Sequence, residues 1–221
     1  MPVRRALIEK RPWLLASIAA ALAFYYLRLT SFPEIWIWPV KGAACAFLAV
    51  YAWQRHDSRD AKLLAVAMAL ASLADMAIEF ALAAGGLVFA AYHIVMVILY
   101  ARHLRERMSF SQKAFAAVML VATPLIAFLL PEDRSMGVLT GVYAILLALM
   151  AAAAWASRFP RYRVGVGAVL FVASDLLIFA ELGPLSGSAV PNAAIWPLYF
   201  IGQFLIATGI IQTLRKGVPD K

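Results

Sequence analysis

The sequence has little charge, one cysteine and only three histidines among its 221 residues. Asp, Glu, Lys and Arg make up 14% of the chain, whereas an average soluble domain contains about 25%. Apolar residues reach 64%, against about 45–50% in soluble domains. This composition excludes a water-soluble fold and a disordered chain, and the single Cys45 excludes a disulfide scaffold. The remaining class is an all-α polytopic membrane protein.

Eight apolar segments have the length of a membrane-spanning helix, which needs about 20 residues. Polar, proline-containing or charged turns separate most of them, and the pair Gly85-Gly86 is expected to break one long apolar run into a hairpin. The apolar stretch near the N-terminus lacks a small-residue cleavage site, which favours a retained first helix over a signal peptide. The sequence therefore predicts one domain, 1–221, with helices at about 12–29, 35–53, 62–83, 86–102, 113–130, 136–156, 164–183 and 193–213.

The distribution of basic residues predicts the orientation of this eight-helix bundle. With the N-terminus inside, 17 Lys and Arg residues lie in inside segments, and Arg134 is the one basic residue of the outside loops. Basic residues collect in cytoplasmic loops, so both termini are predicted to be cytoplasmic. The same bias explains the net charge of +8 without a nucleic-acid partner. The expected location is the cell membrane, as a multi-pass protein of a bacterial inner membrane.

Several polar side chains are predicted to lie within the membrane, where an ionisable residue costs about 2.5–3.5 kcal/mol at the bilayer centre. Lys41 and Glu79 are close enough to helix ends to extend to the interface. His93, Tyr199 and Gln203 are of types that often form interhelical hydrogen bonds. Asp75 and Asp175 lie far from helix ends, and aspartate is too short to reach the interface. These two carboxyl groups are therefore the strongest functional candidates. Tyr143 is a further polar residue, in the outer third of its predicted helix.

Motifs for several common chemistries are missing from the sequence. There is no P-loop, no G-x-S-x-G and no H-E-x-x-H motif. One intramembrane histidine with no second histidine nearby is weak evidence for a metal site. We therefore expect neither a metal nor a cofactor.

Five short motifs, in order along the predicted helices, resemble the YhhN-like lysoplasmalogenase family of eight-helix membrane proteins. They are Lys41, Ser72-Leu73-x-Asp75, His93, Gly167-Ala168-x-Leu170-Phe171-x-x-Ser174-Asp175, and Tyr199-Phe200-x-x-Gln203-x-Leu205-Ile206. The resemblance covers the chain from its second to its eighth helix. Three positions depart from the family pattern: Ala74 replaces a Gly, Gly42 a Pro and Met96 a Tyr.

The resemblance implies an integral-membrane hydrolase. Animal members of the family cleave the vinyl ether bond of lysoplasmalogens to a fatty aldehyde and glycerophosphoethanolamine or glycerophosphocholine. Asp75 and Asp175 would then be the catalytic pair, because one carboxyl group can keep its proton while the other stays ionised in a low dielectric. Substrate-orienting residues would be Lys41, Ser72, Glu79, His93, Tyr143, Ser174, Tyr199 and Gln203. The expected partners are a lysophospholipid substrate and membrane lipids. Intramembrane carboxyl groups also occur in proton relays, so a proton-coupled transporter or a carrier of lipids or small molecules is the alternative.

Overall fold

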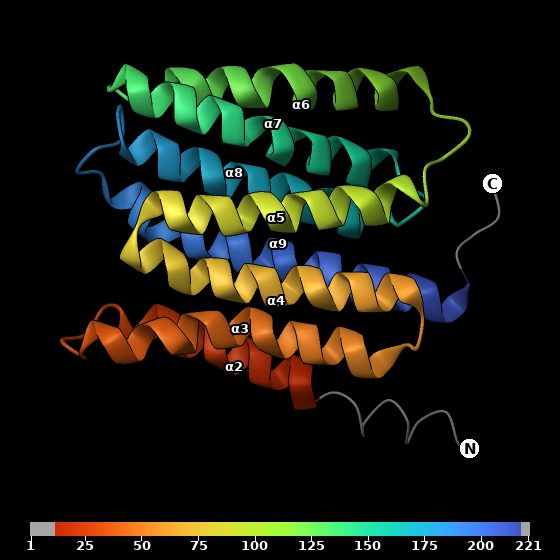
Figure 1. Ribbon diagram of the computed structural model, residues 1–221, viewed down its shortest axis with the longest axis horizontal. Coiled ribbons are helices and arrows are strands. Elements are labelled where there is room, and N and C mark those ends of the chain that lie inside the picture. Colours follow the sequence, from red (N-terminus) through yellow and green to blue (C-terminus); the bar gives the residue numbers. More distant parts are fainter. Residues whose placement is uncertain (1–11, 218–221) are drawn as a thin grey trace. The chain divides into compact units, whose positions relative to one another are not determined.

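Helices form every named element of the computed structural model, which describes residues 12–217. In chain order they are α2 (Pro12–Leu27), α3 (Glu34–Arg55), α4 (Arg59–Phe80), α5 (Leu82–Ala101), α6 (Phe110–Leu129), α7 (Arg134–Ala156), η1 (Arg161–Gly165), α8 (Val166–Glu181) and α9 (Ala189–Lys216) (Figure 1). The all-α class is confirmed. Five basic residues of the orientation argument, Arg4, Arg5, Lys10, Arg11 and Lys221, lie outside the described residues.

Seven of these helical segments are long and apolar enough to cross a membrane, and η1 and α8 together make up one of them. The helix α2 has 16 described residues, slightly fewer than the roughly 17–25 that span a bilayer. The chain is thus a multi-pass helical membrane protein. The eighth span, the orientation and the position of the termini stay predictions.

The chain divides into two compact units, Met1–Val95 and Met96–Lys221, with the division inside α5. This division does not test whether the chain is a single domain, which stays a prediction. In the first unit, α3 packs on both α2 and α4. Two buried hydroxyl groups connect these helices: Ser17 Oγ donates to the Ala44 carbonyl and Ser72 Oγ to the Gly42 carbonyl, each at 2.7 Å. The middle of α3 is therefore joined to a helix on each side.

The turn between α4 and α5 differs from the prediction. Only Ala81, in an extended conformation, separates the two helices, and Gly85-Gly86 lies inside α5 rather than at the break. A Cβ atom at Gly85 would lie 2.6 Å from Ile78 Cβ. The glycine therefore permits close packing of two successive helices, and the predicted helix bounds 62–83 and 86–102 are wrong by up to four residues.

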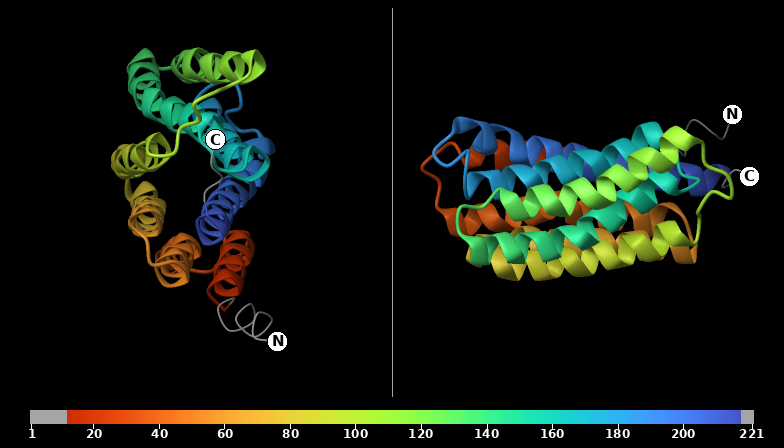
Figure 2. Two further views of the ribbon diagram at one scale, coloured as in Figure 1. Left: turned by 90° about the vertical axis from the view of Figure 1, so that its right-hand side faces the viewer. Right: turned by 90° about the horizontal axis from the view of Figure 1, so that it is seen from above.

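The second unit is built from two helix pairs, α6 with α7 and α8 with α9. Figure 2 shows α6 and α7 side by side. Thr140 Oγ1 donates to the Ala127 carbonyl at 2.6 Å and connects the first pair. In the second pair, a Cβ at Gly167 would lie 2.7 Å from the Gly202 carbonyl oxygen, and a Cβ at Gly202 equally close to the Gly167 carbonyl oxygen. Only glycine at both positions allows the backbones of α8 and α9 to approach this closely.

Helix caps explain why three helices start earlier than predicted. Ser58 accepts a hydrogen bond from the Ala61 amide before α4, and Ser188 accepts one from the Val190 amide before α9. Ser109 and Gln112 form a reciprocal capping box at the start of α6. The predicted starts at 62, 193 and 113 were wrong because hydropathy alone does not register these polar first turns.

Candidate functional site

The first unit holds a polar stripe between α3 and α4. Lys41 Nζ forms an ion pair with Glu79 Oε1, with 14% of the lysine and 30% of the glutamate side chain exposed. Asp75 lies one turn before Glu79 and is 2% exposed. Residues four apart share a helix face, so both carboxylates lie on one side of α4. The stripe combines the Lys41–Glu79 ion pair with a second carboxyl group, that of Asp75.

Close packing of α3 on α4 holds Lys41 in this position. A Cβ at the next residue, Gly42, would lie 3.0 Å from the Ser72 carbonyl oxygen and 2.9 Å from Met76 Cγ. The Ser72 hydroxyl closes the same contact through its hydrogen bond to Gly42. The Lys41 ammonium also lies 5.5 Å from the centre of the Phe24 ring of α2, which favours a cation there.

His93 lies in α5 and belongs to the same unit. Its ring is fully buried and packs edge-to-face on Tyr92, with 5.3 Å between the ring centres. The motif residues Lys41, Ser72, Asp75, Glu79 and His93 thus all belong to the first unit.

The second unit contains the other predicted site residues, arranged around Asp175 on α8. This carboxyl group is 5% exposed, and the Tyr143 hydroxyl of α7 donates to its Oδ2 at 2.7 Å. Ser174 Oγ donates to the Ile195 carbonyl of α9 at 3.0 Å. Tyr143 also packs edge-to-face on Phe179. The phenol therefore has a fixed orientation toward the carboxylate, because its ring is held by the core.

On α9, Tyr199 and Gln203 are both buried and lie one turn apart. Gln203 Nε2 makes a long contact of 3.5 Å to the Tyr199 hydroxyl. The Tyr199 ring packs edge-to-face on Phe171 of α8, with 5.2 Å between the ring centres. Both helices of this pair therefore present polar groups to the interior, and the tight contact of Gly167 with Gly202 fixes their register.

Each of these residues could be selected from the sequence, but the partners that the structure gives them could not. The sequence allowed Lys41 either to reach the membrane interface or to pair with an aspartate, whereas the structure pairs it with Glu79. The similar predicted depth of Lys41 and Glu79 in the membrane was the sequence feature that could have indicated this pair. The bond from Tyr143 to Asp175 joins residues 32 positions apart, and no spacing rule would have found it. Within residues 12–217, no three His, Cys, Asp or Glu side chains are grouped so that they could hold a metal ion.

Comparison with known proteins supports the resemblance carried by these motifs. The model of the YhhN family matches residues 36–210, which is well over half of the chain. Searches of curated proteins and of solved structures gave no significant match.

Proposed function

Because the chain belongs to the YhhN family, we propose that it is an integral-membrane hydrolase that cleaves the vinyl ether bond of lysoplasmalogens. The products are a fatty aldehyde and glycerophosphoethanolamine or glycerophosphocholine. The observation that carries the proposal is the presence of two almost fully buried carboxyl groups, Asp75 and Asp175, on helices that can span a membrane. Such groups are expensive in a bilayer and usually mark a functional site. The proposed location is a bacterial inner membrane.

The chemistry of the reaction needs two carboxyl groups in different protonation states. A proton is transferred to the β-carbon of the vinyl ether, and the α-carbon and oxygen become an oxocarbenium ion. Water adds to this cation, and the resulting hemiacetal collapses to the aldehyde and the free glycerol hydroxyl. One carboxylic acid supplies the proton, and one carboxylate stabilises the cation, as in glycoside hydrolysis. Asp75 and Asp175 share these two roles in the proposal.

The remaining site residues position the pair and the lipid. The phenol of Tyr143 donates to Asp175 and fixes the orientation of this carboxyl group. Lys41 and Glu79 offer one positive and one negative charge, which matches the phosphate and the ammonium of a zwitterionic headgroup. Ser72, His93, Ser174, Tyr199 and Gln203 orient the helices, the substrate or the attacking water.

A lipid panel tests the proposal. Purified protein is incubated with lysolipids that carry a vinyl ether, an alkyl ether or an ester at the same position, and released aldehyde is measured. We expect aldehyde from the vinyl ether alone, and a loss of at least about 100-fold in the variants Asp75→Asn and Asp175→Asn, since acid–base groups contribute about 10²–10⁴-fold.

Melting temperatures in detergent show whether the two variants remain folded. Wild-type rates in both amide variants would refute the acid pair. The transporter would be favoured instead if no lipid released aldehyde and the protein drove proton-coupled uptake of a lipid or small molecule into vesicles.

A further inference from the structure

Basic residues crowd at one end of the second unit. Nine of its ten described Lys and Arg residues lie there, on the connection from α5 to α6, the first turn of α6, the connection from α7 to η1, η1 itself and the last turn of α9. They are Arg102, Arg105, Arg107, Lys113, Arg158, Arg161, Arg163, Arg215 and Lys216. Glu106 is the one acidic residue among the described residues of these segments. This end therefore carries a large excess of positive charge, and we call it the basic end.

Two of the connections that form the basic end are fixed to each other. The Arg105 amide donates to the Ala156 carbonyl at 3.1 Å, and the Arg158 amide donates to the His103 carbonyl at 2.7 Å. The Arg105 side chain adds two bonds, from Nε to the Ser157 carbonyl at 2.6 Å and from Nη2 to the Phe159 carbonyl at 3.2 Å. The guanidinium groups of the two connections are therefore carried on a defined backbone rather than on free loops.

Two arginines of the basic end have neutral hydrogen-bond partners. Arg105 uses neutral carbonyl partners, and Arg163 donates to the amide oxygen of Gln212. Burial and the neighbouring charge of Arg161 lower the pKa of Arg105. The Nε atom of Arg158 is buried and has no hydrogen-bond acceptor among residues 12–217. An anion from outside this unit would be stabilised by arginines held together in this way, beside a donor that residues 12–217 leave unsatisfied.

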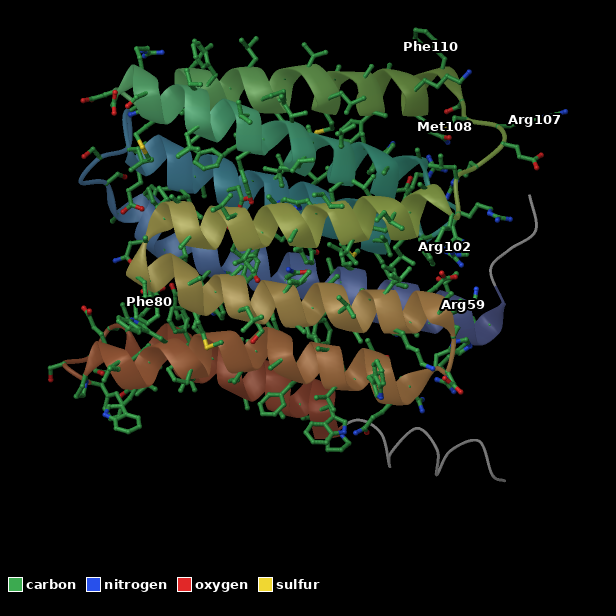
Figure 3. All side chains as sticks on the ribbon, viewed as in Figure 1. Arg59, Phe80, Arg102, Arg107, Met108 and Phe110 are labelled. Carbon is green, nitrogen blue, oxygen red and sulfur yellow. The ribbon has the colours of Figure 1, made fainter. Side chains whose placement is uncertain are left out.

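Two aromatic side chains show which kind of anion fits. Phe110 is 88% exposed and Tyr162 is 87% exposed, and both lie on segments of the basic end. Figure 3 shows Arg102, Arg107 and Phe110 on and next to the connection between α5 and α6. Tyrosine is enriched at the boundary between lipid headgroups and acyl chains, and an exposed phenylalanine ring is apolar enough to contact the acyl chains there. A lipid could contact both the rings and the guanidinium groups, whereas a soluble anion would contact the guanidinium groups alone.

We propose that the basic end is a binding site for the phosphate headgroup of an anionic phospholipid, centred on Arg158 and Arg161. The two guanidinium groups bind the phosphate oxygens, and Phe110 and Tyr162 contact the adjoining glycerol and acyl region. Arginine is suited to this role because its planar fork forms paired hydrogen bonds to phosphate. The site is separate from the proposed chemistry and does not depend on it.

Native mass spectrometry of the full-length protein tests the site. Detergent-solubilised protein is titrated with phosphatidylglycerol, with phosphatidylcholine and with inorganic phosphate. Retention of phosphatidylglycerol alone is expected. Equal retention of the two lipids, or equal competition by inorganic phosphate, would overturn the proposal. This comparison uses wild-type protein and does not depend on any variant.

Variants then locate the site. The double variant Arg158→Gln/Arg161→Gln should bind phosphatidylglycerol about 30-fold more weakly, because each basic residue at an anionic surface contributes about fivefold. The matched control is Arg134→Gln, which removes the single arginine at the start of α7 and should leave binding unchanged. If the glutamine variant does not fold, Arg158→Lys/Arg161→Lys keeps the charge but removes the forks, and it should still lose several-fold. Wild-type binding in a folded glutamine or lysine variant would refute the assignment to these two residues.

Discussion

Breaking the Lys41–Glu79 ion pair from either side should destabilise the protein, and removing both charges together should not. The pair is neither fully exposed nor fully buried, because 14% of the lysine side chain and 30% of the glutamate side chain are exposed. Fully exposed pairs contribute at most about 1 kcal/mol, and removing one partner of a fully buried pair costs about 3–5 kcal/mol. We therefore expect Lys41→Met and Glu79→Gln each to cost about 1–3 kcal/mol. The double variant leaves no unpaired charge and should recover most of this loss.

The assay is a double-mutant cycle measured by unfolding in detergent, with the free energy of unfolding as the readout. The coupling energy is the difference between the double variant and the sum of the singles. The matched control is the cycle Lys62→Met with Asp57→Asn, whose side chains are 48% and 90% exposed, and this cycle should show no measurable coupling. A coupling near zero for Lys41 and Glu79 would refute the reasoning from their burial.

The same double variant separates stability from recognition. If the two charges bind the phosphate and the ammonium of the lipid, the variant should be stable yet show a raised KM for zwitterionic lysolipids. Its kcat should change little, because neither residue has a role in proton transfer in the proposed mechanism. An unchanged KM in the stable double variant would show that the ion pair is structural only.

Three further predictions follow from single contacts. Tyr143→Phe should lower turnover of a lysoplasmalogen about ten- to a hundredfold, since a hydrogen bond to a charged group contributes about 1.5–3 kcal/mol; unchanged turnover in a folded variant would show that the bond to Asp175 has no catalytic role. Gly167→Ala should destabilise the protein by about 1–3 kcal/mol, because the added Cβ meets backbone atoms of α9. The control Gly86→Ala should be tolerated, because a Cβ there has nothing within 4 Å. Equal melting temperatures of the two variants would contradict the packing of α8 on α9 as the cause. A reporter fused at Ser186 should lie on the outer side of the membrane, and a cytoplasmic signal there would refute the predicted orientation.

Much of the fold could be predicted because a bilayer restricts the options. A segment that crosses hydrocarbon must satisfy its own backbone hydrogen bonds, so long apolar runs become helices. Where the sequence analysis was wrong, local polar chemistry decided the result. Ser109 and Gln112 start α6 three residues early, and Gly85 was interpreted as a breaker although its missing side chain serves packing against Ile78. A glycine pair alone does not distinguish these two roles.

The candidate site could be predicted as a set of residue types but not as a set of contacts. The cost of burying charge singled out Asp75 and Asp175 from the sequence alone. The bond from Tyr143 to Asp175 and the pairing of Lys41 with Glu79 depend on how separate helices face each other. The two hydrogen bonds from Arg105 to the carbonyls of Ser157 and Phe159 join residues more than 50 positions apart, and no local sequence feature predicts them.

The single-residue turn at Ala81 has a consequence for how the chain enters the membrane. The helix α4 must carry Asp75 and Glu79 into the bilayer, and one carboxylate at the centre of a helix opposes insertion by about 2.5–3.5 kcal/mol. Directly after the turn, α5 contains no Asp, Glu, Lys or Arg and nine Leu, Ile, Val and Phe residues, which together favour insertion by about 3–5 kcal/mol. Because one extended residue connects the two helices, they are expected to leave the translocation machinery as one hairpin. The apolar second arm then offsets the cost of the carboxylates in the first.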